Sequence, residues 1–196
     1  MHRLLFLPIL FVIAMPGIGQ KKMAVGFSFN FSDFQTPTEI KQTSLGDVIR
    51  SGHWGERSRL DPGFSVYYWR AVTKKIDVSG RYNALFGSNS LATLTNEPGN
   101  LATFFNELET SVHARMFYDN KIVNPFLSAG LGLGNYWKKF GVVGYLPVGA
   151  GLQFNIVNEA YIHLQVNNRI SFNKNKLPNN LFYSLGISQI ITRKKR

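Results

Sequence analysis

The sequence predicts an all-β fold, an eight-stranded antiparallel up-and-down transmembrane β-barrel, and two patterns predict it. In eight stretches apolar residues alternate with polar or small ones, as in residues 26–32, where every second residue is phenylalanine. A period of two indicates strands whose two faces meet different surroundings. The connections between the stretches alternate between short turns and longer loops, which is typical of a barrel that crosses a membrane as a series of hairpins.

Composition favours a surface in contact with lipid. Charged residues make up 17% of the 196 residues, against about a quarter in soluble domains. No segment after residue 20 has the roughly 18 to 20 unbroken apolar residues of a spanning helix, so a membrane span requires a closed barrel. The net charge of +11 lies largely in loops and at the two ends. We expect it to contact outer-membrane lipid and lipopolysaccharide phosphates rather than nucleic acid, with ordinary solvated loop charge as the alternative.

The N-terminal segment has the features of an export signal. A basic start, Met1-His2-Arg3, precedes an apolar run over 4–15, and residues 17–19 suit cleavage before Gln20. We therefore predict a signal peptide at 1–19, an outer-membrane β-barrel at 20–192 and a basic C-terminal tail at 193–196, with an uncleaved anchor as the alternative. The chain has no cysteine, which excludes disulfides and thiolate chemistry.

The first two predicted strands are joined by a long link. Residues 24–34 alternate Val and Phe with Gly, Ser and Asn, and the link 35–61 contains prolines, glycines and a short helix expected near Thr36. Residues 63–72 contain aromatic side chains on both faces, so the pattern leaves their orientation open. We favour the face with Phe64, Val66 and Tyr68 toward lipid.

The third and fourth strands are predicted at 76–86 and 103–118. The third follows a tight turn at 73–75 and alternates clearly, and a loop rich in Asn, Ser, Pro and Gly follows at 87–102. Along 103–118, charged side chains occupy every second position with apolar ones between them, which indicates one wet and one dry face. A second tight turn is expected at 119–121.

The last four strands are predicted at 124–137, 142–157, 160–172 and 181–192. In the fifth, Ser128, Gly130, Gly132 and Gly134 share one face, which leaves room in a narrow lumen for large side chains from opposite strands. Pro147 lacks an N–H, so a bulge or a local loss of a ladder bond is expected there. The links are a short one at 138–141, a tight turn at 158–159 and a polar loop at 173–180.

An even number of strands leaves both ends of the chain on the side of the short turns, which is periplasmic in exported barrels. Aromatic residues near the predicted strand ends indicate belts at the two membrane interfaces. These residues are Phe34, 67–69, 104–105, 117–118, 136–137, Tyr145, Phe172 and 182–183.

Three segments rich in glycine and aromatic residues, 124–134, 146–154 and 182–188, resemble the small outer-membrane β-barrel proteins of the OmpA transmembrane type. The resemblance covers about residues 23–192. It implies an integral outer-membrane protein of a Gram-negative cell envelope, inserted by the barrel-insertion machinery. Family members commonly end on an aromatic residue, whereas this chain ends Thr192-Arg193-Lys194-Lys195-Arg196. With no peptidoglycan-binding domain after the barrel, no cell-wall tether is expected, and we expect a monomer without cofactor or metal.

The clearest cluster of polar residues in the sequence is the one predicted to line the lumen. In a barrel of eight strands the interior is just wide enough to be filled by side chains, and buried charges need partners. We therefore expect an internal network of salt bridges and hydrogen bonds, with a narrow ion path as the alternative. The predicted members are Asp77, Arg81, Glu107, Glu109, His113, Arg115, His163, Gln165 and Arg169. The predicted lipid-facing residues are Phe27, Phe29, Val78, Val112, Ala114, Leu131, Leu152, Leu164 and Ile187.

The predicted function is a structural or surface-interaction role in the outer membrane. One alternative is a lipid A-modifying enzyme, because Glu109, Ser111 and His113 are residue types of a hydrolase. Residues two apart on a strand lie about 6 to 7 Å apart, too far for a direct hydrogen bond, and the His-x-Ser-Asn pattern of lipid A deacylases is absent. We therefore expect no catalytic residue. The other alternative is a secreted lipocalin-like carrier with its apolar face inside, but the Gly-x-Trp of lipocalins near the first strand is missing.

Overall fold

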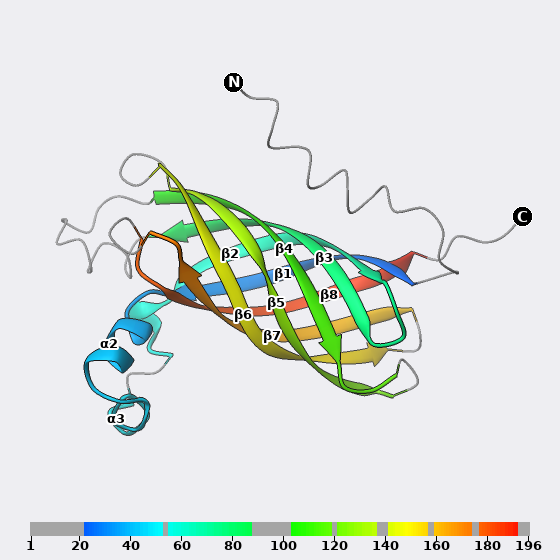
Figure 1. Cartoon of the computed structure of the whole chain (residues 1–196), viewed down its shortest axis with the longest axis horizontal. Coiled ribbons are helices and arrows are strands. Elements are labelled where there is room, and N and C mark those ends of the chain that lie inside the picture. Colours follow the sequence, from blue (N-terminus) through cyan, green and yellow to red (C-terminus); the bar gives the residue numbers. More distant parts are fainter. Residues whose placement is uncertain are drawn as a thin grey trace, which may run out of the picture.

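The computed structural model describes residues 22–52, 55–87, 103–118, 121–136, 141–156, 159–173 and 177–191. Eight antiparallel strands form a closed barrel in which each strand pairs with its neighbours along the chain and the last pairs with the first (Figure 1). The predicted fold class is therefore confirmed. The strands are β1 (Met23–Asp33), β2 (Asp61–Ala71), β3 (Ile76–Gly87), β4 (Thr103–Arg115), β5 (Val123–Tyr136), β6 (Gly141–Ile156), β7 (Ala160–Ser171) and β8 (Asn180–Ile191).

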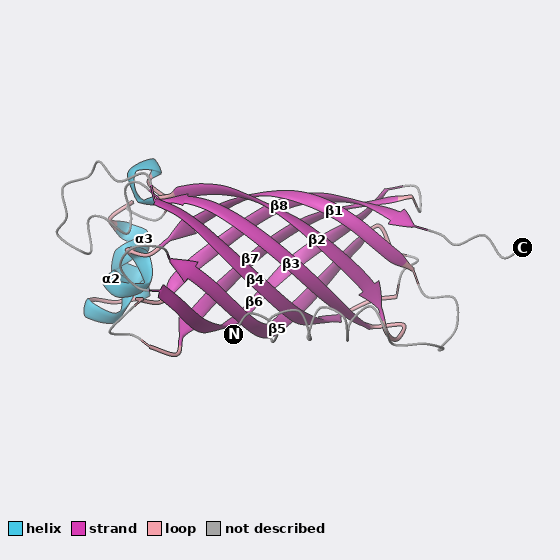
Figure 2. Ribbon diagram, turned by 90° about the horizontal axis from the view of Figure 1, so that it is seen from above, coloured by secondary structure: helices cyan, strands magenta, loops and turns pink. Residues whose placement is uncertain are grey.

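The two ends of the barrel differ in their connections. One, here called the turn end, has the links 72–75, 116–122 and 157–159 together with the start of β1 and the end of β8. The other, the loop end, has the links 34–60, 88–102, 137–140 and 172–179. Two short helices, α2 (Thr36–Gln42) and α3 (Leu45–Arg50), lie beyond the loop end (Figure 2). No helix in the described ranges is long and apolar enough to cross a membrane.

The segment after β1 folds into helices because of local polar contacts. The Asp33 carboxylate accepts hydrogen bonds from the backbone N–H groups of Gln35 and Thr36, both at 2.9 Å, and so begins the helix that was expected near Thr36. Ser44 accepts from the N–H of Asp47 at 3.1 Å and caps α3, a helix that the sequence did not predict. Both contacts satisfy backbone donors that a helix leaves free at its start, although only Ser44 is the N-cap residue of its helix.

The orientation of β2 follows the favoured alternative. Ser65, Tyr67 and Trp69 are buried, whereas Phe64 and Val66 are exposed on the outer wall. β2 lies between β1 and β3, and the register with these strands gives all three the same division into inner and outer faces. The inner face therefore carries two of the largest aromatic side chains of the strand.

Two details of the strands differ from expectation. β4 ends at Arg115 rather than near Tyr118. Met116 still donates its N–H to the carbonyl of Pro125 at 2.9 Å, but 117–118 lie outside the ladder, and the link to β5 is longer than a tight turn. At Pro147 the pairing of β6 with β5 is interrupted between Val148 and Tyr145, but the register on either side is the same. Pro147 therefore causes a local loss of ladder pairing without a bulge.

Glycines on the inner face make room for large rings. A Cβ on Gly132 would lie 2.2 Å from the ring of Tyr145, and one on Gly151 would lie 2.4 Å from the ring of Phe126. The space predicted from small residues on β5 is therefore used, although by rings of adjacent rather than opposite strands. The predicted signal peptide and the basic tail lie outside the described residues.

Candidate functional site in the barrel lumen

All nine polar residues predicted for the lumen lie on inner faces and are buried, each with an exposed fraction of 5% or less. They come from three strands. β3 supplies Asp77 and Arg81, β4 supplies Glu107, Glu109, His113 and Arg115, and β7 supplies His163, Gln165 and Arg169. Their charges comprise three arginines and three carboxylates, so this set is balanced. The structure brings them together in three groups.

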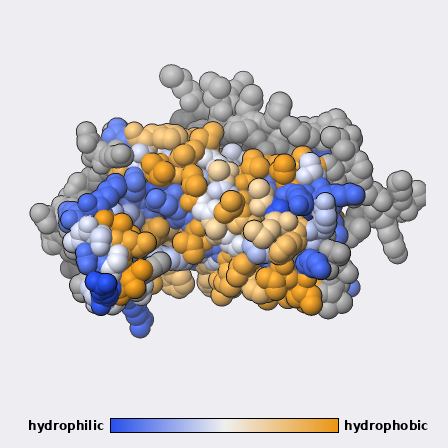
Figure 3. All heavy atoms as spheres, turned by 60° about the horizontal axis from the view of Figure 1, so that its bottom comes forward, coloured by the Kyte–Doolittle hydropathy of each residue, from blue (hydrophilic) through white to orange (hydrophobic). Residues whose placement is uncertain are grey.

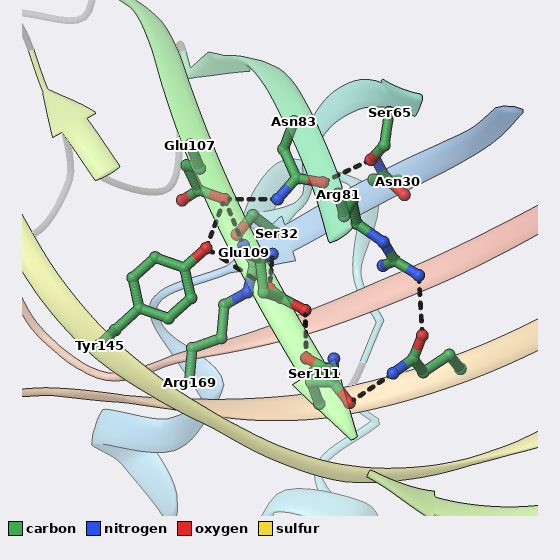
Figure 4. A network of polar contacts seen from close by, with 12 residues as sticks. Asn30, Ser32, Ser65, Arg81, Asn83, Glu107, Glu109, Ser111, Tyr145 and Arg169 are labelled. Atoms are coloured by element: carbon green, nitrogen blue, oxygen red, sulfur yellow. Dashed lines mark hydrogen bonds and ion pairs between the residues drawn. The ribbon is translucent and has the colours of Figure 1, made fainter. Parts of the chain in front are cut away.

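The first group surrounds Arg169 (Figure 4). Its Nη1 donates to Oε2 of Glu107 at 2.7 Å, and its Nη2 donates to Oε2 of Glu109 at 2.9 Å. The guanidinium lies 3.5 Å from the ring centroid of Phe182 and 4.9 Å from that of Tyr145. Hydrogen bonds to charged groups are stronger than neutral ones, and rings attract the cation through their faces. Arg169 therefore links β4, β6, β7 and β8 across the lumen.

Neutral hydrogen bonds extend this group toward β1. Asn83 donates from Nδ2 to Glu107 at 3.1 Å, and Asn83 also contacts Ser65, which in turn contacts Asn30 (Figure 4). The Tyr145 hydroxyl lies 3.4 Å from both Glu107 and Glu109. Buried polar groups must find partners inside the protein, and this series of hydrogen bonds from Asn30 to Tyr145 joins five strands in one network.

The second group is centred on Gln165. Arg81 donates from Nη2 to its carbonyl oxygen at 2.9 Å, and its amide nitrogen donates to Ser128 at 3.2 Å and to Asn167 at 3.1 Å. The Arg81 guanidinium also lies 5.4 Å from the ring centroid of Tyr67. This group crosses the lumen from β3 to β5 and β7.

The third group lies toward the turn end. Nε of Arg115 is 2.8 Å from Oδ2 of Asp77, and Nη2 donates to Oδ1 at 3.1 Å. Farther from the turn end than this pair, the ring of Trp69 stacks on His113 with centroids 3.9 Å apart and lies 4.7 Å from the ring of His163. Just outside the strands, burial and the neighbouring charge of Arg115 lower the pKa of Lys22.

An apolar cluster lies at the loop end of the lumen. Its buried members are Phe34, Leu85, Phe105, Val143, Leu177 and Phe182. They come from four strands and from the links 34–60 and 172–179, which bring Phe34 and Leu177 over the barrel mouth. The ring of Phe182 belongs to this cluster and also contacts Arg169, so the apolar cluster and the ion-pair group meet at one side chain.

The structure does not assemble the suspected hydrolase set. Nε2 of His113 lies 2.8 Å from Oγ of Ser79, not of Ser111, and Ser111 donates to Glu109 at 3.2 Å. His113 Nδ1 has no hydrogen-bond partner within the described part of the chain, so no acid orients the ring there. All of these side chains lie inside the barrel, away from its outer wall. No group of three His, Asp or Glu residues suited to a metal ion occurs among the residues described.

Apart from Tyr67 and Trp69, which the favoured orientation of β2 places inside, the aromatic side chains of the lumen were not predicted from the sequence. The expectation of interfacial belts is wrong for Phe34, Tyr67, Trp69, Phe105, Tyr145 and Phe182, which are buried. In adjacent aromatic pairs such as 104–105 and 182–183 the alternation sends one ring outward and the next inward. Counting every second position along each strand was the signal that could have separated the aromatic residues of the lumen from those of the outer wall. Phe104, Phe117, Tyr118 and Phe172 are exposed near strand ends, and 136–137 lie outside the described side chains.

The outer wall carries the predicted lipid-facing residues. Phe27, Phe29, Val112, Leu131, Leu152, Leu164 and Ile187 have exposed fractions of 38% to 61%, Ala114 is exposed and Val78 is partly exposed. On the side drawn in Figure 3, apolar residues cover most of the middle of the barrel, and hydrophilic residues gather toward its ends. An apolar surface of this extent is rare on a soluble monomer and marks a surface that contacts lipid or another protein.

Comparison with known proteins identifies the fold. No protein-family model matches the chain, and no curated protein matches its sequence. Among solved structures, the N-terminal β-barrel domain of Pseudomonas aeruginosa OprF matches with a TM-score of 0.54 and 12% identity, covering 88% of this chain and all of that one. Neisserial surface protein A matches with a TM-score of 0.53 and 11% identity, covering 91% of this chain and all of that one. The chain thus has the fold of the small eight-stranded outer-membrane β-barrels.

Proposed function

We propose that this protein is an integral outer-membrane β-barrel with a structural or surface-interaction role, whose lumen is closed by its own side chains. The observation that carries the proposal is the division of polarity across the wall. Apolar side chains such as Phe29 and Leu131 are exposed outside, while ion pairs such as Arg169 with Glu107 and Glu109 are buried inside. This division is the reverse of a soluble lipocalin-like carrier, whose apolar face surrounds a ligand.

Closure of the lumen is supported at three levels. The apolar cluster with Phe34 and Leu177 covers the loop end, the Arg169 group crosses the middle, and the Arg115–Asp77 pair lies toward the turn end. A side chain that moved to open an ion path would leave a buried charge without its partner, which is costly. We infer a barrel without a steady ion path and without an enzymatic site.

The partners that fit are lipid and the insertion machinery. The exposed apolar wall fits outer-membrane lipid, and the cationic loops fit lipopolysaccharide phosphates. In the loop-end segment, Arg50 and Arg57 are exposed, and so are the apolar Leu45 and Ile49 of α3. Loops on a rigid barrel are where surface contacts arise, so we assign the surface role to this end. The protein is a monomer delivered by a signal peptide that is cleaved before Gln20.

Two measurements test the proposal. In cells that express the protein, we expect it in the outer-membrane fraction, with a gel mobility that shifts on heating and a mature N-terminus at Gln20 by mass spectrometry. Protein that is soluble without detergent would contradict the membrane assignment. In planar bilayers we expect no steady conductance, and a stable open channel in the unmodified protein would contradict closure of the lumen while leaving the membrane assignment intact.

A further inference from the structure

A groove of about 620 Å³ lies on the outer wall of the barrel, in the half next to the turn end. It crosses β4, β5, β6 and β7, and apolar side chains of these strands line it. The row of paired residues Ala114, Leu127, Ala150 and Val166 runs through it from strand to strand. Three strand spacings of about 4.8 Å give this row a length of roughly 14 Å.

The groove exists because short side chains lie among long ones. Ala114 and Ala150 flank Leu127 in the central row, and Pro125 lies in the next row between Met116 and Leu152. The alanines and the proline do not reach as far from the wall as the residues beside them. The hollow is therefore narrow and elongated, with walls of flexible apolar side chains.

A cationic cluster lies at the turn-end edge of this groove. Lys74 and Lys75 are in the link 72–75, and Lys121 is in the link 116–122, and all three are exposed. Nζ of Lys75 lies 5.0 Å from the ring centroid of Tyr118, and the backbone carbonyl of Tyr118 accepts from the N–H of Lys121 at 3.2 Å. Tyr118 follows the groove residue Met116 by two positions. The link also contains Asp119, so the four charged residues sum to +2.

We propose that the groove binds one acyl chain of an anionic glycerophospholipid whose phosphate contacts Lys75 and Lys121. The inference rests on the proposed membrane location, because the turn end then faces the periplasm and the groove lies in the phospholipid leaflet. An aromatic ring beside lysines at the end of an apolar surface is the arrangement expected at headgroup level. A flexible chain fills a narrow hollow, and the phosphate above it meets the lysines.

A second copy of the protein fits this surface less well. Both copies would have to insert with their turn ends on the same side, so the lysines at the edge of one groove would face those of the other. Like charges brought together at an interface oppose association. The neighbouring wall of a barrel is also convex, so it would bridge the groove rather than enter it.

Native mass spectrometry of the refolded protein tests the proposal. The protein in detergent micelles is mixed with equal amounts of phosphatidylglycerol, phosphatidylethanolamine and phosphatidylcholine of the same chain length. We expect a single retained lipid, with phosphatidylglycerol favoured at least tenfold over phosphatidylcholine. Ala150→Phe fills the groove and is expected to reduce retention of all three lipids at least tenfold. If Ala150→Phe does not fold, Ala114→Phe takes its place.

Matched controls separate the groove and the lysines from general effects. Ala129 also faces outward on β5 but lies outside the groove, so Ala129→Phe is expected to retain lipid as the unmodified protein does. Lys75→Gln with Lys121→Gln is expected to abolish the preference for phosphatidylglycerol, whereas Lys41→Gln on α2 at the opposite end leaves it unchanged. Each variant is first checked for its heat-dependent gel mobility, which reports whether the barrel is folded.

Three outcomes would overturn the inference. Retention that is equal for Ala150→Phe and Ala129→Phe would mean that lipid binds the whole wall without a site. If the preference for phosphatidylglycerol persists without both lysines, these lysines do not bind the headgroup. A dimer that Ala150→Phe dissociates would assign the groove to a second copy. In each case an intact heat-dependent shift leaves the membrane assignment standing, whereas its loss in the unmodified protein refutes that assignment instead.

Discussion

Replacing Arg169 by methionine is expected to destabilise the barrel by about 3–5 kcal/mol. Arg169 is 1% exposed and forms ion pairs with Glu107 and Glu109 at 2.7 and 2.9 Å. Methionine keeps much of the volume beside Phe182 but leaves two carboxylates in the lumen without this cation. Removing one partner of a buried pair typically costs 3–5 kcal/mol because the remaining charge is uncompensated. The contacts from Asn83 and Tyr145 remain, so we expect a folded but less stable barrel.

Urea unfolding in lipid vesicles measures this change. Tryptophan fluorescence, to which the buried Trp69 contributes, reports the transition, and linear extrapolation gives the free energy of unfolding. Arg57→Met is the matched control, because Arg57 is exposed beyond the loop end and its loss should change stability by less than about 0.5 kcal/mol. A loss below about 1 kcal/mol for Arg169→Met would refute the assignment of a buried, paired network. Adding Glu107→Gln and Glu109→Gln to the variant should restore part of the lost stability, since the uncompensated charges are then gone.

Three further substitutions test the wall, the lumen and the loop end by the same unfolding measurement. Val112→Arg, on the outer wall, should cost about 2–4 kcal/mol if it lies near the middle of the bilayer, and an unchanged stability would count against a lipid-facing wall. Gly149→Ala should cost about 1–3 kcal/mol by overpacking, because a Cβ there lies 2.0 Å from the carbonyl oxygen of Val166, whereas Gly80→Ala meets open space and should be close to neutral. Leu177→Ala should cost about 2–5 kcal/mol, since Leu177 is 1% exposed in the loop-end cluster, and an effect no larger than that of Leu45→Ala, which removes an exposed side chain, would show that the cluster contributes little.

Alternation along the chain was enough to predict the strands and the closed barrel. Each predicted strand overlaps an observed one, and in most cases the bounds agree within one residue, because the inner and outer faces impose the period of two directly. Two bounds differ by more, since β2 begins at Asp61 rather than at 63, and β4 ends at Arg115 although 116–118 continue an apolar pattern. The helix α3 was not predicted because it is only six residues long. The Ser44 cap and the burial of Val48, rather than periodicity, determine it.

The composition of the lumen was predictable, but the pairing inside it was not. Alternation assigns Glu107, Glu109 and Arg169 to inner faces, yet Arg169 meets the glutamates because β4 and β7 face each other across the closed barrel. Such partners depend on the register of every strand between them and on the tilt that closure requires. Tyr145 was expected at an interface because it lies near a predicted strand end, but it shares the inner face of β6 with Gln153, and its ring lies inside against Gly132.

Closure of the barrel by the pairing of Met23 with Ile191 has a consequence for how the chain reaches this state. The first strand to be synthesised finds one of its two neighbours only when the last strand arrives. Any intermediate with fewer strands has two edges of free N–H and C=O groups, which hydrocarbon cannot satisfy. Strands therefore cannot enter the bilayer one by one as stable species, and contacts between the most distant parts of a chain form slowly. Insertion should be a late, concerted and rate-limiting event, during which the apolar outer faces of the unfinished chain need protection in the aqueous space outside the bilayer.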